Sequence, residues 1–243
     1  MSAPVFVVAA DRLAVGRVVV DGVEGRHAAT VTRLAPGEAV VLTDAHGRRA
    51  TGVVAGAERD VLSVDVTSVV DVPAPQPRFV VVQALPKGDR GELAVETMTE
   101  VGVDVVVPWA ATRCVTRWRD ARGQKALSRW RTSGHSAAKQ SRRAWFPEIA
   151  ELATTAEVAE LLSAAAFAVV LHESATTPLA TVELPSAGDV VLVVGPEGGV
   201  SDDELSAFRE AGAATYRLGE TVLRTSTAGT AALAVLSATS RWA

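Results

Sequence analysis

Three glycines and one glutamate lie in one short stretch, Gly195-Pro196-Glu197-Gly198-Gly199, directly after an apolar run. Glycine lets the main chain approach a ligand closely and adopt positive φ angles. The next residues, 201–204, have the spacing of a helix capping box and place three acids in the first turn. These acids would repel a phosphate, and the spacing matches neither a P-loop nor a dinucleotide fingerprint. By itself the stretch therefore indicates a plain glycine-rich turn, and as a binding loop it would suit a ligand that is neutral or cationic near the glycines.

Two other stretches stand in the same position relative to apolar runs. His172-Glu173-Ser174 follows the run that ends at Leu171, and residues 218–225 follow the run that begins at Ala214. In open α/β sheets, ligands bind at the carboxyl ends of the parallel strands. If these runs are strands of one parallel sheet, each of the three stretches lies where a ligand can bind.

The elements that position these stretches alternate along the second part of the chain. The expected strands are continuous apolar runs, which is typical of a parallel sheet that is covered on both faces. The sequence therefore predicts an α/β fold. Strands are expected at residues 79–85, 103–108, 164–171, 190–194 and 214–218, and helices at 91–101, 201–211 and 227–241.

The first part of the chain has a different pattern. Short β-branched runs in residues 1–71 are separated by Gly, Asp and Pro, which predicts a small β-barrel with one short helix at residues 27–34. Residues 72–77, VPAPQP, alternate proline with other residues and are expected to form an extended linker. We therefore expect domains at 1–71 and 78–243.

Composition excludes several classes of protein. The single cysteine, Cys114, excludes an internal disulfide, and with four scattered histidines no metal site is expected. No apolar run approaches the roughly 20 residues needed to cross a bilayer, and the N-terminus lacks a signal-peptide pattern. We expect a cytoplasmic protein with no membrane partner.

Positive charge is concentrated between residues 113 and 143, although the formal net charge of the chain is -4. Clustered arginine is typical of phosphate binding, whereas a helix face built for solubility mixes both signs. We expect this segment to contact a polyanion, and we expect its tryptophans to turn inward rather than stack on bases. Its ten basic residues are Arg113, Arg117, Arg119, Arg122, Lys125, Arg129, Arg131, Lys139, Arg142 and Arg143.

Taken together, these stretches resemble the RsmE family of SPOUT-class RNA methyltransferases. The resemblance rests on QALPKGDRGELAVETMTEVG at 83–102, GPEGG at 195–199 and LGETVLRTSTA at 218–228. It extends to HAATVTRLAPGE at 27–38 and AAKQSRRAWFP at 137–147, so it covers nearly the whole chain. GPEGG alone is moderately specific, but the segments in this order are strongly so.

The resemblance implies a fold, a cofactor and a reaction. It implies a PUA-like RNA-binding barrel, followed by a parallel α/β domain whose last part forms a trefoil knot. It also implies a homodimer that transfers a methyl group from S-adenosylmethionine to N3 of a uridine in small-subunit (16S) ribosomal RNA, either naked or in the 30S subunit. The cofactor-binding residues that it implies are Leu171, His172, Glu173, Val194, Gly195, Glu197, Gly198, Gly199, Leu218, Gly219, Val222, Leu223 and Thr225.

The expected methylation reaction suggests roles for further residues. Methylation of N3 requires loss of the imide proton, and Arg224 is the candidate that stabilises the resulting anion, with a structural ion pair as its alternative. Glu197 is expected to hold the glycine loop by bonding main-chain N–H groups rather than to act as a catalytic carboxylate. Ser226, Lys139 and Thr221 depart from the residues usual in the family. The candidate RNA contacts are Arg33, Lys87, Arg90, Arg113, Arg142 and Arg143.

Two other functions fit the same sequence. An enzyme of this class can instead methylate a ribose 2′-OH, and the barrel expected at the N-terminus favours the base. A non-catalytic RNA-binding assembly factor is the second alternative, and the intact GPEGG stretch argues against it.

Overall fold

A computed structural model describes residues 3–242, which form two compact units. The first unit comprises Met1–Ala74 with Ala138–Phe146, and the second comprises Pro75–Ala137 with Pro147–Ala243. These compact units differ from the expected division at 71 and 78 in one segment, because residues 138–146 belong to the first unit. Among the residues described, no helix has both the length and the apolar character that crossing a bilayer requires.

The first unit is built on a five-stranded sheet with the order β1-β3-β4-β5-β2. All neighbouring strands are antiparallel except β1 and β3, and the core contains Phe6, Leu13, Leu42 and Leu62. The helix expected at 27–34 begins earlier, at Gly22, and changes to a π-helix before it ends. The elements are β1 (Val5–Val7), η1 (Ala10–Arg12), β2 (Gly16–Val20), α1 (Gly22–Arg26), η2 (His27–Val31), β3 (Ala39–Thr43), β4 (Arg48–Glu58) and β5 (Val61–Asp71).

Three contacts explain why residues 138–146 pack with the first unit. The Lys139 ammonium lies 2.7 Å from both carboxylate oxygens of Glu24, and both side chains are largely buried. The indole N–H of Trp145 donates to the Val72 carbonyl at 2.8 Å. The same indole lies over Gly47, where a Cβ atom would approach it to 2.7 Å. Lys139, which departs from the family pattern, thus has its own carboxylate partner here.

The second unit is built on a six-stranded parallel sheet with the order β11-β9-β10-β6-β7-β8. Its valine-rich central strands are buried, as expected for a sheet covered on both faces. The parallel sheet expected from the sequence is confirmed, although the short strand β8 was not expected. The strands are β6 (Arg78–Ala84), β7 (Val105–Trp109), β8 (Glu148–Ile149), β9 (Phe167–Leu171), β10 (Asp189–Val194) and β11 (Ala214–Tyr216).

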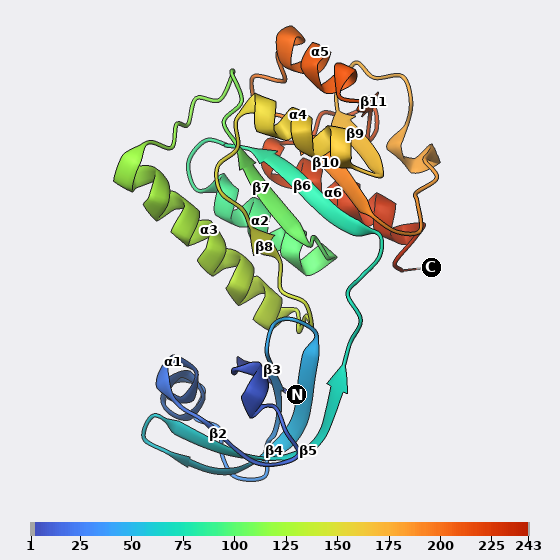
Figure 1. Ribbon diagram of the computed structural model, residues 1–243. Coiled ribbons are helices and arrows are strands. Elements are labelled where there is room, and N and C mark those ends of the chain that lie inside the picture. Colours follow the sequence, from blue (N-terminus) through green and yellow to red (C-terminus); the bar gives the residue numbers. More distant parts are fainter. Residues whose placement is uncertain (1–2, 243) are drawn as a thin grey trace. The chain divides into compact units, whose positions relative to one another are not determined.

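Helices cover both faces of this sheet (Figure 1). The helices α2 and α6 pack together behind β6 and β10, while α4 and α5 lie together on the opposite face. Close approach of α2 and α6 depends on Gly229, because a Cβ atom there would lie 2.6 Å from the Met98 sulfur. The helices are α2 (Arg90–Val101), α3 (Asp120–Gln140), α4 (Thr155–Ala164), η3 (Leu179–Thr181), α5 (Asp202–Glu210) and α6 (Thr225–Ala238).

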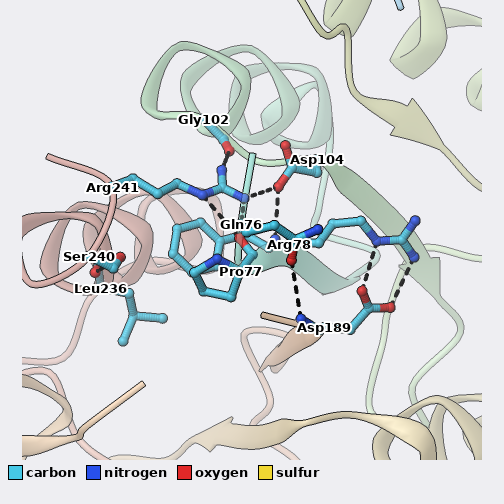
Figure 2. Close-up of polar contacts among 11 residues, drawn as sticks. Gln76, Pro77, Arg78, Gly102, Asp104, Asp189, Leu236, Ser240 and Arg241 are labelled. Atoms are coloured by element: carbon cyan, nitrogen blue, oxygen red, sulfur yellow. Dashed lines mark hydrogen bonds and ion pairs between the residues drawn. The ribbon is translucent and has the colours of Figure 1, made fainter. Parts of the chain in front are cut away.

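A polar cluster fixes the chain just after α6 to the start of β6 (Figure 2). The Arg241 guanidinium donates to the Gly102 carbonyl at 2.7 Å, to the Pro77 carbonyl and to the Asp104 carboxylate. The side chains of Arg241 and Asp104 are only 12% and 10% exposed. Asp104 also accepts the Phe79 N–H at 2.8 Å, and the guanidinium lies over the Phe79 ring. This cluster anchors the C-terminal end of the helix whose other end lines the site described next.

Candidate functional site

The three stretches singled out in the sequence line one pocket of about 930 Å³ at the carboxyl ends of β9, β10 and β11. Parallel pairing places these strand ends at the same edge of the sheet, which is why segments far apart in sequence meet there. Every residue expected to bind the cofactor lines this pocket, and so does Arg224. The residues are Leu171, His172, Glu173, Val194, Gly195, Glu197, Gly198, Gly199, Leu218, Gly219, Val222, Leu223, Arg224 and Thr225.

The glycines of the 195–199 stretch are required by the protein itself. A Cβ atom at Gly195 would lie 2.8 Å from a methyl carbon of Val200. At Gly198 it would lie 3.1 Å from the Cβ of Arg113, and Gly199 has a φ of +72°. Only glycine adopts that conformation without strain. The main chain is therefore exposed to the pocket, because no side chain covers it.

Glu197 fastens this glycine loop to the segment that follows β6. Its carboxylate accepts the main-chain N–H of Lys87 at 3.1 Å and lies 4.0 Å from the Arg90 guanidinium. This contact joins residues 110 positions apart. The geometry agrees with the holding role expected for Glu197.

Glu204 is a second anchor, and it is 3% exposed. With Ser201 it forms the capping box expected from the sequence, and its other carboxylate oxygen accepts the Thr112 N–H at 2.7 Å. Burial by itself would raise the pKa of Glu204, but the hydrogen bonds from Thr112 and Ser201 outweigh it and hold this pKa below its ordinary value. The sequence did not indicate the contact with Thr112, because residues 112 and 204 meet only in the folded sheet.

Arg113 lies next to this anchor and contacts the glycine loop. Its guanidinium donates to the Gly198 carbonyl at 3.3 Å and to the Val200 carbonyl at 3.4 Å. Arg113 lines the pocket while these bonds hold the loop. The structure therefore shows a loop-holding contact for a residue that the sequence suggested only as an RNA contact.

Arg224 occupies the N-cap position of α6. Its carbonyl accepts the N–H groups of Thr227 at 2.9 Å and Ala228 at 3.0 Å, and the residue is exposed and lines the pocket. Within residues 3–242, no carboxylate forms an ion pair with Arg224. The structural ion pair considered for Arg224 thus has no partner in this part of the chain. In the same loop, Arg217 pairs instead with Glu220 at 3.2 Å.

His172 contributes an oriented imidazole to the pocket. Its Nδ1 accepts the Ser174 main-chain N–H at 3.3 Å and lies 2.8 Å from the Ser174 hydroxyl. An Nδ1 that accepts a hydrogen bond leaves the proton of the neutral ring on Nε2. His172 can therefore donate through Nε2 to a group in the pocket.

Gln83 is a residue of this region that the sequence analysis did not select. It is fully buried near the end of β6, and its amide nitrogen donates to the carbonyls of Ala84 at 3.0 Å and Thr225 at 3.3 Å. Its Oε1 has no hydrogen-bond partner among the residues described. Gln83 thus ties β6 to the first residue of α6. The signal in the sequence was a single amide within the apolar run FVVVQAL.

The candidate RNA contacts divide between the two units. In the second unit, Lys87 and Arg90 are exposed and line a smaller hollow of about 620 Å³, and Arg90 lines the main pocket as well. In the first unit, Arg33 and Arg142 are exposed, with φ angles of 58° and 57°, and Arg143 is half-buried.

The tryptophans of the basic segment face the protein. Trp130 is 3% exposed, packs edge-on against Trp118 at 5.0 Å, and lies over Gly91, where a Cβ atom would approach it to 2.4 Å. The expectation that Trp130 turns inward is confirmed. Trp145 likewise contacts the protein, because its indole N–H donates to the Val72 carbonyl and its ring lies over Gly47.

Comparison with known proteins identifies the family of this fold and pocket. The family model for the RNA methyltransferase domain matches residues 73–237. The chain belongs to the RNA methyltransferase family. It is 49% identical over 229 residues to "Ribosomal RNA small subunit methyltransferase E" of Mycobacterium bovis, with 92% of this chain and 87% of the relative covered. The protein of the same name in Bacillus subtilis is 27% identical, with 90% and 88% covered.

Solved structures of the RNA methyltransferase family have the same fold over almost the full length. The ribosomal RNA small subunit methyltransferase E of Neisseria gonorrhoeae, bound to S-adenosylmethionine, superposes with a TM-score of 0.86 at 27% identity and covers 98% of both chains. A methyltransferase of Legionella pneumophila with the same cofactor superposes with a TM-score of 0.85 at 25% identity and covers 99% of both chains.

The single cysteine of this family member, Cys114, lies outside the pocket lining. Cys114 is buried, and burial raises the pKa of its thiol, so the reactive thiolate is disfavoured. Among residues 3–242, no three His, Cys, Asp or Glu side chains are grouped so that they could hold a metal ion.

Proposed function

We propose that this RNA methyltransferase transfers a methyl group from S-adenosylmethionine to N3 of a uridine in small-subunit (16S) ribosomal RNA. The observation that carries the proposal is the single pocket that three separate loops form at the carboxyl edge of the parallel sheet. The names of the relatives support the RNA substrate, and two solved relatives bound to S-adenosylmethionine support the cofactor.

The residues of the pocket fit a cofactor with an aromatic base and a cationic end. Apolar side chains and exposed main chain would hold the adenosine, because Leu171, Val194, Leu218 and Ala228 line the pocket beside the glycine loop. Acidic side chains would attract the positive charges of the sulfonium and ammonium groups. The acids that line the pocket are Glu173, Glu197, Asp202 and Glu220.

The chemistry assigns roles to two side chains in the pocket. The bound cofactor supplies an electrophilic methyl group on sulfur. The N3 proton passes to solvent water, N3 bonds to the methyl carbon, and the carbon–sulfur bond breaks to leave a neutral thioether. Arg224 stabilises the negative charge on uracil before the transfer, since its guanidinium stays charged and Arg224 lines the pocket without a carboxylate partner in residues 3–242. The Nε2–H of His172 donates to an oxygen of the bound substrate or cofactor.

We propose further features at the level of the whole protein. The first unit acts as a PUA-like RNA-binding barrel, and Leu218–Thr225 forms part of a trefoil knot with the adjoining strands. The chain order supports the knot, because the loop after the edge strand β11 returns to α6, which packs on β6 and β10. The protein is a cytoplasmic homodimer, and the exposed Val222 and Leu223 side chains beside the pocket support a contact with a second copy.

The test is methyl transfer to small ribosomal subunits from a strain that lacks the activity, with naked 16S RNA tested in parallel. We expect one methyl group per RNA, located on a uridine base at N3 by mass spectrometry of the digested RNA. A methyl group on ribose would assign the protein to 2′-O methylation, and cofactor binding without transfer to either substrate would contradict the proposed reaction. Absence of cofactor binding in calorimetry would favour a non-catalytic assembly factor.

A further inference from the structure

The ten cations between residues 113 and 143 divide into two groups in the folded protein. Most of these cations form ion pairs or hydrogen bonds with other groups of the protein. Arg129 pairs with Glu92 at 2.7 Å, Arg131 with Glu151 at 2.9 Å and Lys139 with Glu24 at 2.7 Å. The guanidinium of Arg117 donates to the carbonyls of Ala111 and Thr112, both at 2.9 Å. The charge cluster seen in the sequence is therefore largely a set of structural contacts.

Three of the remaining cations lie together at the start of α3. Arg119, Arg122 and Lys125 are exposed, and no side-chain hydrogen bond or ion pair joins them to another group in residues 3–242. The Arg119 carbonyl accepts the Gly123 N–H at 3.0 Å, so Arg119 begins the first turn of the helix. Within α3, Arg122 and Lys125 are three residues apart and project from neighbouring positions on one face, while Arg119 immediately precedes the helix and Asp120, with a φ of 48°, turns the chain between them. The opposite face carries Gly123 and Leu127, which are buried.

This end of α3 adjoins the segment that leads to the pocket. The Thr116 hydroxyl donates to the Pro86 carbonyl at 2.7 Å, and Trp130 packs over Gly91 at the start of α2. Lys87 and Arg90, which lie between these two contacts in sequence, are exposed. Arg90 also lines the pocket. Exposed cations are therefore present at the start of α3, in the adjoining segment and, through Arg90, in the lining of the pocket.

We propose that Arg119, Arg122 and Lys125 form a track that binds the phosphodiester backbone of the RNA substrate and leads it to the pocket through Lys87 and Arg90. Asp89 and Asp120 stand among these five cations in the sequence and Arg90 already has Glu197 at 4.0 Å, so Arg119, Arg122, Lys125 and Lys87 supply the surplus of positive charge. Unpaired cations release counterions when they neutralise phosphates, whereas cations already paired with carboxylates contribute little. This inference rests on the proposed function and deepens it, because it assigns the RNA contact to the catalytic unit as well as to the first unit.

The test compares two triple variants that lose the same net charge. The track variant carries Arg119→Gln, Arg122→Gln and Lys125→Gln. The control carries Arg17→Gln, Arg78→Gln and Arg131→Gln, each of which loses an exposed ion pair with Asp65, Asp189 or Glu151. Binding of naked 16S RNA is measured from about 50 to 200 mM salt, the range over which phosphate contacts change affinity strongly.

We expect the track variant to bind RNA at least about tenfold more weakly near 50 mM salt, with a salt slope smaller by roughly 2. Cofactor affinity should be unchanged in both variants, and the control should keep the salt slope of the original protein. A track variant with an unchanged slope, or a control with an equal loss, would overturn the proposal. A change from dimer to monomer in light scattering would also overturn it, by assigning the face to a second copy.

A methyl-transfer assay of the original protein distinguishes failure of the track from failure of the proposed function. If the original protein methylates N3 of uridine and the track variant keeps its salt slope, only the track is wrong. If the original protein methylates nothing, the proposed function fails, while the RNA-binding comparison still tests the track. The single variants Arg122→Gln and Lys125→Gln, each expected to lower the slope by about 0.7 to 0.9, replace the triple variant if it does not fold.

Discussion

Arg224 combines two roles at the residue scale. Its main chain caps α6, and the residue lines the pocket without a carboxylate partner in residues 3–242. Because the main chain provides the cap, removal of the side chain should leave the helix intact. The site therefore allows the chemical role of this cation to be separated from its structural one.

We expect Arg224→Ala to lower kcat by about 100-fold and to change cofactor affinity by less than about threefold, because the charge it stabilises is on uracil rather than on the cofactor. Single-turnover methyl transfer and calorimetry measure the two effects. Arg217→Ala is the matched control, since Arg217 lines the same pocket but is paired with Glu220. Normal turnover by Arg224→Ala would remove this residue from the mechanism.

Gly195 tests whether the shape of the glycine loop determines cofactor binding. In Gly195→Ala the new methyl group meets the Val200 side chain, so the loop must shift, and we expect affinity to fall at least about tenfold. The double variant Gly195→Ala/Val200→Ala should recover part of the loss, because it removes the methyl group in conflict. The control is Gly56→Ala, which lies outside the pocket lining and where no described atom lies within 4 Å of the added carbon. Equal affinity for Gly195→Ala and the original protein in calorimetry would show that the loop tolerates the shift.

At the scale of elements, Glu204 holds the start of α5 against the segment after β7. Its pKa lies below the ordinary glutamate value of about 4.3, so near that pH the folded state binds fewer protons than the unfolded state. The stabilisation is therefore complete above this range and is lost as pH falls through the folded pKa. Glu204→Gln should cost about 1–3 kcal/mol at pH 7, because it weakens charged hydrogen bonds in a buried site.

Urea unfolding from pH 7 to pH 3 checks this expectation. The difference in unfolding free energy between the original protein and Glu204→Gln should shrink as the pH falls below about 4. A difference that stays constant across this range would show that the charge of Glu204 does not contribute to stability.

The polar cluster around Arg241, just after α6, should contribute to the stability of the second unit. Asp104→Ala leaves the nearly buried Arg241 guanidinium without its carboxylate, so we expect a loss of about 3 kcal/mol in unfolding free energy. Asp189→Ala is the control, because its pair with Arg78 is exposed and should contribute less than about 1 kcal/mol. Equal losses in urea unfolding would contradict the distinction between the two pairs.

At the scale of the whole molecule, the first unit is discontinuous in sequence. Residues 138–146 supply the partner of Glu24 and the indole that lies over Gly47. A fragment that ends at Ala74 lacks these contacts, and we expect it to unfold at a lower temperature than the same unit in the full chain. Adding a peptide of residues 138–146 should raise its Tm by mass action, whereas a peptide with Lys139→Ala and Trp145→Ala should not. A fragment as stable alone as with the first peptide would show that the segment is dispensable.

Local patterns in the sequence predicted most of the elements of the second unit and the loops of its candidate site. Continuous valine-rich runs indicated a parallel sheet, and the positions of the three stretches after these runs marked them as candidate binding loops, which the family resemblance assigned to one cofactor. The capping box of α5 could also be predicted, since its two members, Ser201 and Glu204, are only three residues apart in the chain. These features depend on local spacing, which the sequence records directly.

The partners of the charged residues could not be predicted from the sequence and became known from the folded structure. The sequence shows ten cations between residues 113 and 143, but not that Arg129 faces Glu92, that Lys139 faces Glu24 or that Arg113 holds the glycine loop. Likewise, the contact between Glu204 and Thr112 joins residues 92 positions apart. A charge has no preferred partner along the chain, and packing of distant segments selects which opposite charge or carbonyl comes within a few ångströms. Which cations remain available for RNA is therefore a property of the fold.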